Sequence, residues 1–502
     1  MFKQQTIKIH NGLSLLAAGE DFGTFELELE KTDITDKPTR INIMLDKSGS
    51  MDDMCEDGKT KMEQILHVVT NMIRYISSNC LRQNVRVNVK TFNTEVQDVI
   101  VDEIITEENL PEMIGRLRKI YPENSTDIEC ALKALNSGEE SNNIFMSDGD
   151  ANYGETRPEE LAKLIDAKAT NYVVGFGLEH NPKIFAALSN IENGSYYFVD
   201  KIEKSATAYG EILHGILHGA LRDVKIMIEN GMIYNWKTNE WTTEIFVGKM
   251  SGEMKKTFNF KTVNKEGMEM TLRGHSELHG EIIYKYHGNE GEPGDLTNMF
   301  YRHRTQEILH KVKKINEKTK TTKLEIAEMK KEMKAFMAEM MDYMKKNALT
   351  EDRMMKNLCD DIVVVYRTLG TEYGFMYSCA RQQSNGAERS HNASDTPRAP
   401  RAQRQRHARF GNFSGLHMRQ CSVLPAEDAC EEAHEEDDYN KYSLSRSSNE
   451  DNVFGFMDEQ ELDKEEEEED EFEKLINNHE MSPTYCSQDV EKVINSLNEE
   501  DA

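Results

Sequence analysis

The sequence predicts an α/β protein built on a doubly wound, mostly parallel sheet, and two observations support this prediction. Between residues 38 and 218, short apolar segments alternate with longer segments whose apolar residues recur every three or four positions. Such an alternation of strands and helices is typical of a parallel sheet with helices on both faces. Polar residues also follow two of the predicted strands, at the sheet edge where open α/β sheets bind ligands.

The predicted elements of this unit follow one another in order. Residues 41–45 form a short apolar run that predicts a buried strand, and residues 59–78 carry apolar side chains at helical spacing. The other expected strands are 85–89, 96–105, 143–146, 172–176 and 196–199, and the other expected helices are 128–135, 158–168, 182–191 and 202–217.

Antiparallel strands are expected on both sides of this unit. Residues 24–30 alternate between apolar and acidic side chains, which is typical of a strand with one solvated face. Similar patterns occur at 224–228, 244–247, 256–261 and 281–286. We therefore expect an N-terminal β segment (1–37) and a β-rich region (219–296), and interpret them as two parts of a small β-sandwich into which the α/β domain (38–218) is inserted.

Residues 297–381 are predicted to be helical, and residues 382–502 to be a disordered tail. A stripe of apolar side chains in the helical region predicts a core-facing or helix-pairing surface, so self-association through these helices, as in a coiled coil, is an open alternative. The tail is Arg-rich and then acidic, with 12 Lys and Arg against 30 Asp and Glu, and it carries −18 of the net charge of −29. Its last apolar residues predict a short helix on a partner. The stripe is Met329, Met333, Phe336, Met340 and Met344, and the last apolar residues are Val490, Val493, Ile494 and Leu497.

Composition argues against several function classes. The acidic balance disfavours binding to nucleic acid or to an anionic membrane. No segment reaches the roughly 20 apolar residues of a spanning helix, and the N-terminus does not resemble a signal peptide. The 8 cysteines are scattered without a C-x-x-C pair, which favours free thiols in a reducing compartment. We expect a cytoplasmic protein.

The residues that could bind a ligand follow the first predicted strand and a later one (143–146), and precede a helix between them. The sequence L-D-K-S-G-S-M places Asp46, Ser48 and Ser50 in one short loop. Thr126 stands in N-S-T-D-I-E before a helix, and Asp148 stands in F-M-S-D-G-D after a strand. Carboxylates and hydroxyls without His or Cys suit a hard divalent cation, Mg²⁺ first, with Mn²⁺ or Ca²⁺ as alternatives.

This combination resembles the von Willebrand factor type A (vWFA) domain, whose Rossmann-like fold carries a metal-ion-dependent adhesion site (MIDAS). The resemblance implies that Asp46, Ser48, Ser50, Thr126 and Asp148 are metal ligands, directly or through water. Asn124 and Ser125 stand where many relatives have Gly, and we expect Asp127 and Asp150 to be nearby carboxylates rather than ligands. The flanks are similar to vWFA proteins related to plant RING-type ubiquitin ligases, but this chain lacks the paired Cys and His ligands of a RING.

These observations predict a metal-dependent protein-binding module that acts as an intracellular adaptor or scaffold. Its Mg²⁺ would accept an Asp or Glu side chain from a protein partner. The alternative is an accessory subunit of a ubiquitin-ligase or ATPase assembly. A metal-dependent hydrolase has less support, because the sequence offers no evident nucleophile or base, so we expect no enzyme activity.

Overall fold

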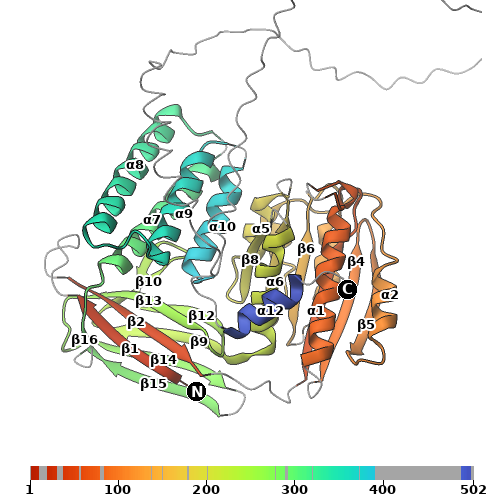
Figure 1. Cartoon of the computed structure of the whole chain (residues 1–502), viewed down its shortest axis with the longest axis horizontal. Helices are drawn as coiled ribbons and strands as arrows, with labels where there is room; N and C mark the ends of the chain where they lie inside the picture. The colour runs from red at the N-terminus through yellow and green to blue at the C-terminus, as the bar shows by residue number, and fades with distance from the viewer. Residues whose placement is uncertain are drawn as a thin grey trace, which may run out of the picture. The chain divides into compact units, whose positions relative to one another are not determined.

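The computed structural model describes residues 2–10, 20–30, 38–389 and 488–498, apart from short internal gaps (Figure 1). The predictions for the Arg-rich and acidic parts of the tail, and for Asp150, concern residues outside the described part of the chain. The gaps are residues 56–57, 80–83, 137, 139, 150, 178–179, 200–201, 277–278, 289–291, 319 and 372.

A six-stranded sheet forms the centre of the α/β domain, with the strand order β5-β4-β3-β6-β7-β8. Neighbouring strands are parallel except at the β4–β5 edge, so the predicted doubly wound, mostly parallel sheet is confirmed. The order changes direction between β3 and β6, which makes their carboxyl ends the topological switch point. The strands are β3 (Thr39–Asp46), β4 (Val85–Phe92), β5 (Val96–Ile104), β6 (Asn142–Ser147), β7 (Thr170–Phe176) and β8 (Gly194–Val199).

Helices cover both faces of this sheet, because successive side chains of a strand point to opposite sides. On β3, Ile41, Ile43 and Leu45 belong to the core that includes α1 and α6. Met44 belongs to the opposite core, which includes α3 and α5. The helices of this domain are α1 (Lys61–Asn79), α2 (Leu110–Leu117), α3 (Ile128–Leu135), α4 (Pro158–Ala162), α5 (Pro182–Ser189) and α6 (Ile202–Leu217).

Two helices differ from the prediction. Helix α2 was not predicted, because Pro111 and Gly115 interrupt its pattern, although Pro is tolerated in the first helical turn. Helix α4 was expected to reach Lys168 but ends at Ala162. There the side chain of Asp166 accepts hydrogen bonds from the amides of Lys168 (3.0 Å) and Gly138 (2.9 Å), which holds the backbone in a turn.

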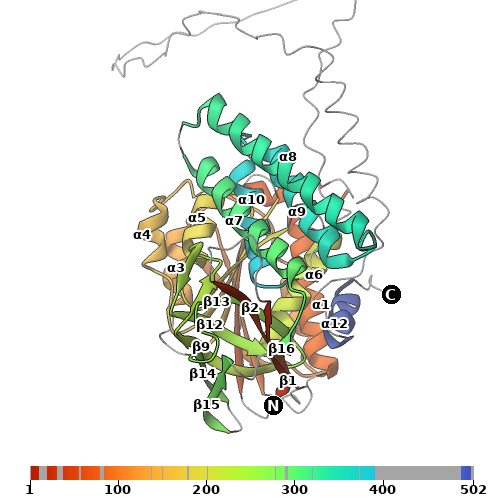
Figure 2. The same ribbon diagram turned by 90° about the vertical axis from the view of Figure 1, so that its left-hand side faces the viewer.

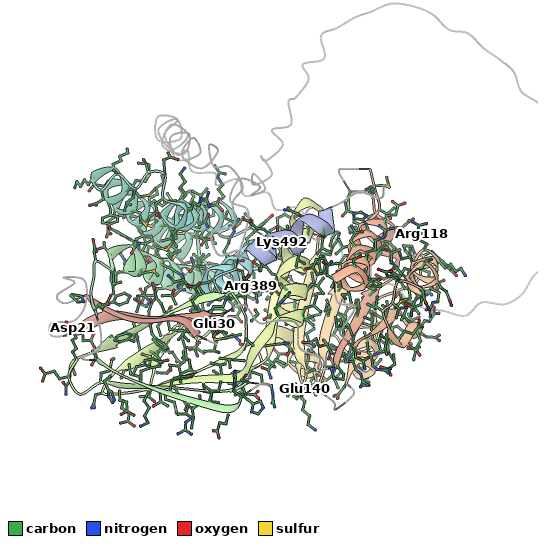
Figure 3. The ribbon with its side chains drawn as sticks, turned by 60° about the horizontal axis from the view of Figure 1, so that its bottom comes forward. Asp21, Glu30, Arg118, Glu140, Arg389 and Lys492 are labelled. Atoms are coloured by element: carbon green, nitrogen blue, oxygen red, sulfur yellow. The ribbon has the colours of Figure 1, made fainter. Side chains whose placement is uncertain are left out.

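Two further sheets form a β-sandwich around a shared apolar core, with the strand orders β11-β10-β13-β2-β1-β16 and β12-β9-β14-β15. Strand β2 (Asp21–Leu29), whose ends Figure 3 marks with the labels Asp21 and Glu30, pairs antiparallel with β13 (Lys255–Thr262). The predicted pairing of the N-terminal strand with the later strands is therefore confirmed. The other strands are β1 (Phe2–His10), β9 (Gly219–Glu229), β10 (Met232–Asn235), β11 (Glu240–Thr242), β12 (Glu244–Ser251), β14 (Glu269–Ser276), β15 (Gly280–His287) and β16 (Glu292–Pro293).

The helical region contains α7 (Thr297–Glu317), α8 (Lys323–Lys346), α9 (Arg353–Thr368) and α10 (Gly374–Gly386) (Figures 1 and 2). The apolar stripe on α8 is buried, as a core-facing stripe predicts. Helix α10 continues past residue 381, where the tail was expected to begin. The polar residues there are satisfied inside the structure, since the Gln382 side chain donates to the Trp236 carbonyl (2.8 Å) and that of Asn385 to the Asp361 carboxylate (2.9 Å).

One helix lies inside the segment that was expected to be a disordered tail. Helix α12 (Gln488–Asn498) packs against α1 and α6 of the α/β domain. The predicted helix therefore forms, but it packs on the chain itself rather than on a separate partner.

None of the helices in the described part of the chain is long and apolar enough to cross a membrane.

Candidate metal site

The five predicted ligands come from three loops that meet at one edge of the central sheet. Asp46 ends β3, and Asp148 directly follows β6, which pairs in parallel with β3. Both carboxylates therefore lie at the carboxyl ends of adjacent strands, at the switch point of the sheet. The structure brings Ser48, Ser50 and Thr126 to the same place.

The first loop is organised by Asp46. One carboxylate oxygen, Oδ1, accepts a hydrogen bond from the backbone N–H of Ser48 (2.8 Å), which turns the chain back toward the sheet edge. The other oxygen, Oδ2, accepts a short hydrogen bond from the hydroxyl of Ser147. A short 3₁₀ helix, η1 (Gly49–Asp52), follows and carries Ser50. The sequence analysis did not identify Ser147, which orients Asp46 from the neighbouring strand.

The hydroxyl groups converge beside Gly149. The Ser50 hydroxyl donates to Asp148 Oδ1 (2.8 Å), and the Ser48 and Ser50 hydroxyl oxygens lie 3.1 Å apart. A Cβ atom placed on Gly149 would lie 3.4 Å from Thr126 Oγ1 and 3.6 Å from Ser50 Oγ. Because Gly149 has no side chain, the space between the hydroxyls of Ser50 and Thr126, which belong to different loops, stays open.

Two asparagines hold Thr126 in place. The side chain of Asn152 accepts a hydrogen bond from the Thr126 amide (2.8 Å), and the Asn124 carbonyl accepts one from the Gly49 amide (2.9 Å). Asn124 has a φ of 66°, in the left-handed region that Gly adopts freely and Asn tolerates. Asn can therefore occupy this position without large strain. Asp127 caps α3 by accepting from the Cys130 amide (3.0 Å), so it has a structural role.

The two carboxylates are fully buried, and burial of unpaired negative charge is costly. Burial raises the pKa of Asp46 to about 6, although hydrogen bonds from Ser147 and Ser48 lower it, and the nearby charge of Asp148 raises it further. A site with this electrostatic balance favours the binding of a cation.

The chain itself places one cation in this site. Lys61, the first residue of α1, lies with its Nζ 2.8 Å from Asp148 Oδ2 and 3.2 Å from Asp53 Oδ2. Lys61 was not predicted as part of the site. A lysine in the first helical turn is unfavourable for the helix dipole, but nothing in the sequence indicates which carboxylate it contacts. Lys47, by contrast, pairs with Glu123 (2.6 Å) and Gln97 (3.1 Å).

The donor set fits a hard divalent cation. Two carboxylates and three hydroxyls supply only oxygen, and their charges would balance a 2+ ion. No cluster of three or more His, Cys, Asp or Glu suited to a metal occurs among the described residues. That these five residues bind a metal remains a prediction.

The loops around the site expose apolar side chains. Met54 follows η1, Tyr153 follows β6, and Tyr121 precedes Thr126 in the third loop, each more than half exposed. The ring of Tyr121 contacts Lys47, next to Asp46, and the Tyr153 amide donates to the Thr126 carbonyl (3.2 Å). Each ligand-bearing loop thus contributes one exposed apolar side chain.

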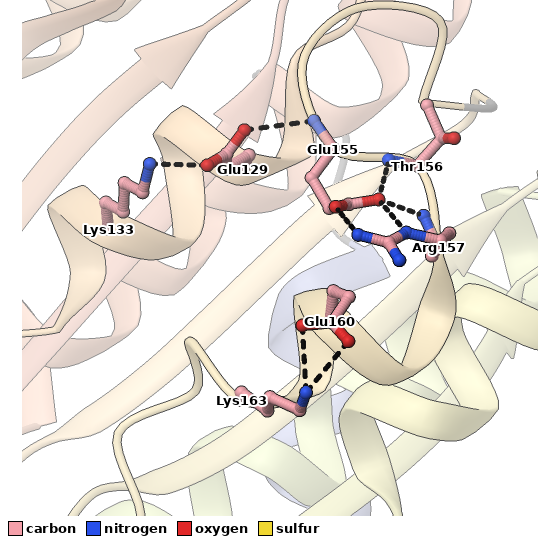
Figure 4. Close-up of polar contacts among 7 residues, drawn as sticks. All are labelled: Glu129, Lys133, Glu155, Thr156, Arg157, Glu160 and Lys163. Atoms are coloured by element: carbon pink, nitrogen blue, oxygen red, sulfur yellow. Dashed lines mark hydrogen bonds and ion pairs between the residues drawn. The ribbon is translucent and has the colours of Figure 1, made fainter.

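Hydrogen bonds and ion pairs lie along the loop that carries Tyr153 (Figure 4). The Glu155 amide donates to the Glu129 carboxylate on α3 (2.9 Å). The Glu155 carboxylate accepts from the Arg157 guanidinium (2.7 Å), and these hydrogen bonds lower the pKa of Glu155 to about 2. The loop is therefore anchored to α3, the helix that Thr126 precedes.

A comparison with protein-family models gives a match for the α/β domain. Residues 41–211 match the family model of the von Willebrand factor type A domain. Domains of this family are typically non-catalytic modules that mediate protein–protein interaction. No curated protein sequence matches the chain.

Several solved structures are similar in fold. A von Willebrand factor type A protein from Catenulispora acidiphila is 12% identical over 77% of this chain and 98% of its own, with a TM-score of 0.47. The ArnB paralog VWA2 from Sulfolobus acidocaldarius is 10% identical over 76% and 98%, with a TM-score of 0.44. Proximal thread matrix protein 1 from the mussel byssus, with a zinc-occupied MIDAS motif, is 18% identical over 37% and 48%, with a TM-score of 0.30.

Proposed function

We propose that the chain is a divalent-metal-dependent protein-binding module that acts as an intracellular adaptor or scaffold, because residues 41–211 match the family model of the von Willebrand factor type A domain. The metal would be Mg²⁺, with Mn²⁺ or Ca²⁺ as alternatives, and the partner would supply an Asp or Glu side chain. The observation that carries this proposal is the convergence of Ser50, Thr126 and Asp148 around Gly149.

The five residues of the site would have two roles, to balance the charge of the ion and to complete its coordination. Asp46 and Asp148 would balance the ion, and Ser48, Ser50 and Thr126 would complete its shell with neutral oxygen. A bound Mg²⁺ would supply an electrophilic position for a partner carboxylate oxygen. Lys61 would have to move its ammonium away from Asp148 for the ion to use both carboxylate oxygens.

The exposed side chains around the site support a protein as the partner. Met54, Tyr121 and Tyr153 lie exposed on the three loops, and Met and aromatic side chains are enriched at protein interfaces. Aromatic side chains at such positions often dominate the binding energy. The accessory-subunit role in a ubiquitin-ligase or ATPase assembly stays an alternative prediction, and no contact in the described residues favours it.

The proposal is tested first by direct metal titration. Calorimetric titration of the full chain with Mg²⁺, Mn²⁺ and Ca²⁺ should show one site per chain, and Asp46→Ala and Asp148→Asn should abolish it. Asp98→Ala, which changes an exposed carboxylate on β5, is the matched control. Circular dichroism would show that the variants remain folded.

The second test concerns the partner. Proteins captured from native lysate in Mg²⁺ should be lost in EDTA and with Asp46→Ala, but retained with Asp98→Ala. Capture that persists in all conditions would remove the metal from the binding mechanism and leave the domain as a scaffold.

A further inference from the structure

The C-terminal helix α12 packs on the α/β domain far from its neighbours in the sequence. Figures 1 and 2 show it beside α1 and α6, and Figure 3 labels Lys492 on this helix. The preceding helix, α10, ends at Gly386, and residues 390–487 lie between the two described parts of the chain. The contact therefore joins segments that are widely separated in sequence.

One face of α12 is apolar and buried, and the other is polar. The buried side chains recur at intervals of three and four, as on one face of a helix, and they belong to the same core as α1 and α6. Glu491, Lys492 and Asn495 are exposed. The buried side chains are Val490, Val493, Ile494 and Leu497.

Gly210 on α6 allows the two helices to come close. A Cβ atom on Gly210 would lie 2.6 Å from Ile494 Cγ1, 3.2 Å from its Cα and 3.3 Å from its amide nitrogen. Its nearest neighbours are thus atoms of Ile494, including backbone atoms that cannot easily move. A glycine in the middle of a helix weakens it relative to alanine, so this position serves the contact with α12 rather than α6 itself.

A specific polar contact accompanies the apolar packing. The side chain of Asn71, buried on α1, donates a hydrogen bond to the carbonyl of Leu497 (3.0 Å). That carbonyl lies in the last turn of α12, where helical carbonyls lack partners within the helix. Helices α1 and α6 therefore contact both the apolar face and the C-terminal end of α12.

We propose that the groove between α1 and α6 is a helix-binding site whose ligand is residues 488–498 of the same chain, held reversibly. An isolated helix shorter than about 12–15 residues is marginal in water, so α12 depends on the groove for its structure. Because α12 and the groove belong to one chain, docking is an intramolecular step whose strength is set by an effective concentration. A partner helix with the same spacing of apolar side chains competes for this groove.

The test uses a fluorescent peptide of residues 487–502 and the full-length chain. Val493→Asp places a charge on the buried face of α12 and should empty the groove. Asn495→Asp adds the same charge on the exposed face and is the matched control. The peptide should bind the Val493→Asp chain by fluorescence anisotropy, and at least about tenfold more weakly to the wild type and to Asn495→Asp.

A second variant tests whether the peptide binds beside Gly210 on α6. Gly210→Ala should abolish peptide binding to the Val493→Asp chain, because its methyl group would meet the backbone of Ile494. The change favours α6 itself, so loss of binding would not reflect unfolding. Circular dichroism of each variant would confirm this.

Three outcomes would overturn the proposal. Failure of the peptide to bind the Val493→Asp chain would make α12 a permanent part of the core. Equal binding to the wild type would mean that the groove is empty in the native chain. A concentration-dependent dimer that Val493→Asp dissolves would make the ligand the helix of a second copy.

Discussion

The ammonium of Lys61 lies 2.8 Å from the buried carboxylate of Asp148, within the group of residues predicted to bind a metal. Asp148 receives the Ser50 hydroxyl on its other oxygen, so both of its oxygens have partners. A divalent ion at this site would therefore meet a cation that the chain already supplies. The ammonium of Lys61 should therefore lower the affinity of the site for a divalent metal.

Lys61→Met should bind divalent metal more tightly than the wild type. Loss of a charged hydrogen bond of about 1.5–3 kcal/mol to Asp148 would raise affinity about tenfold to a hundredfold. The metal-free variant should be less stable, because Asp148 would lose its charge partner. Calorimetric titration and thermal unfolding with and without Mg²⁺ would measure both effects.

Lys59→Met is the control, since Lys59 is exposed and close in sequence. Weaker metal binding by Lys61→Met would contradict competition and would show that the lysine supports the ligand Asp148 instead.

Thr126→Val should weaken metal binding by about tenfold, because it replaces the hydroxyl beside Gly149 with a methyl group. The amide of residue 126 can still donate to Asn152, so unfolding free energy should change by only about 1 kcal/mol. Metal titration is the measurement, and Thr156→Val, at an exposed position in the next loop, is the control. Unchanged affinity would exclude Thr126 from the metal shell.

Met54→Ala and Tyr153→Ala should each reduce partner capture while leaving metal affinity unchanged. Both side chains are exposed, so neither substitution should change unfolding free energy by more than about 0.5 kcal/mol. Quantitative capture in Mg²⁺ would detect the loss, and Met232→Ala on the β-sandwich is the matched control. If capture is unaffected, the partner does not use the surface around the metal site.

Asp361, on α9, should make stability depend on pH. Burial raises its pKa from the ordinary value of 3.8 to about 7, although Arg381 and Asn385 lower it and Asp360 raises it. The folded chain thus holds a proton that the unfolded chain releases above about pH 4. The contribution to unfolding free energy is therefore present at low pH and is lost as pH rises from about 4 to about 7.

Asp361→Asn should abolish the loss of unfolding free energy that the ionisation of Asp361 causes as pH rises. The unfolding free energy of the variant relative to the wild type should rise by about 2 kcal/mol between about pH 5 and about pH 8. Denaturant titration at several pH values measures it, with Asp342→Asn on α8 as the exposed control. A difference that does not vary with pH would show that Asp361 is ionised throughout this range.

The local sequence pattern contained enough information to predict the central sheet and the ligand loops. The middle of β3, residues 41–45, is mostly apolar because both of its faces are covered, and α1 shows the spacing of a helix with one buried face. Since parallel strands end at the same edge, Asp46 and Asp148 could be expected to meet. The order of the strands predicted that β2 pairs with one of the later strands, but only the structure shows that this strand is β13.

Tertiary structure alone decided how the remaining residues are used. Lys61 and Ser147 reach the site because α1 and β6 pack beside it, and no spacing in the sequence specifies those contacts. The short helix at 488–498 was predicted from its apolar residues, but only the structure shows that its apolar face packs against α1 and α6. A short amphipathic helix gains its stability from packing rather than from its own residues, so its partner cannot be deduced from its sequence.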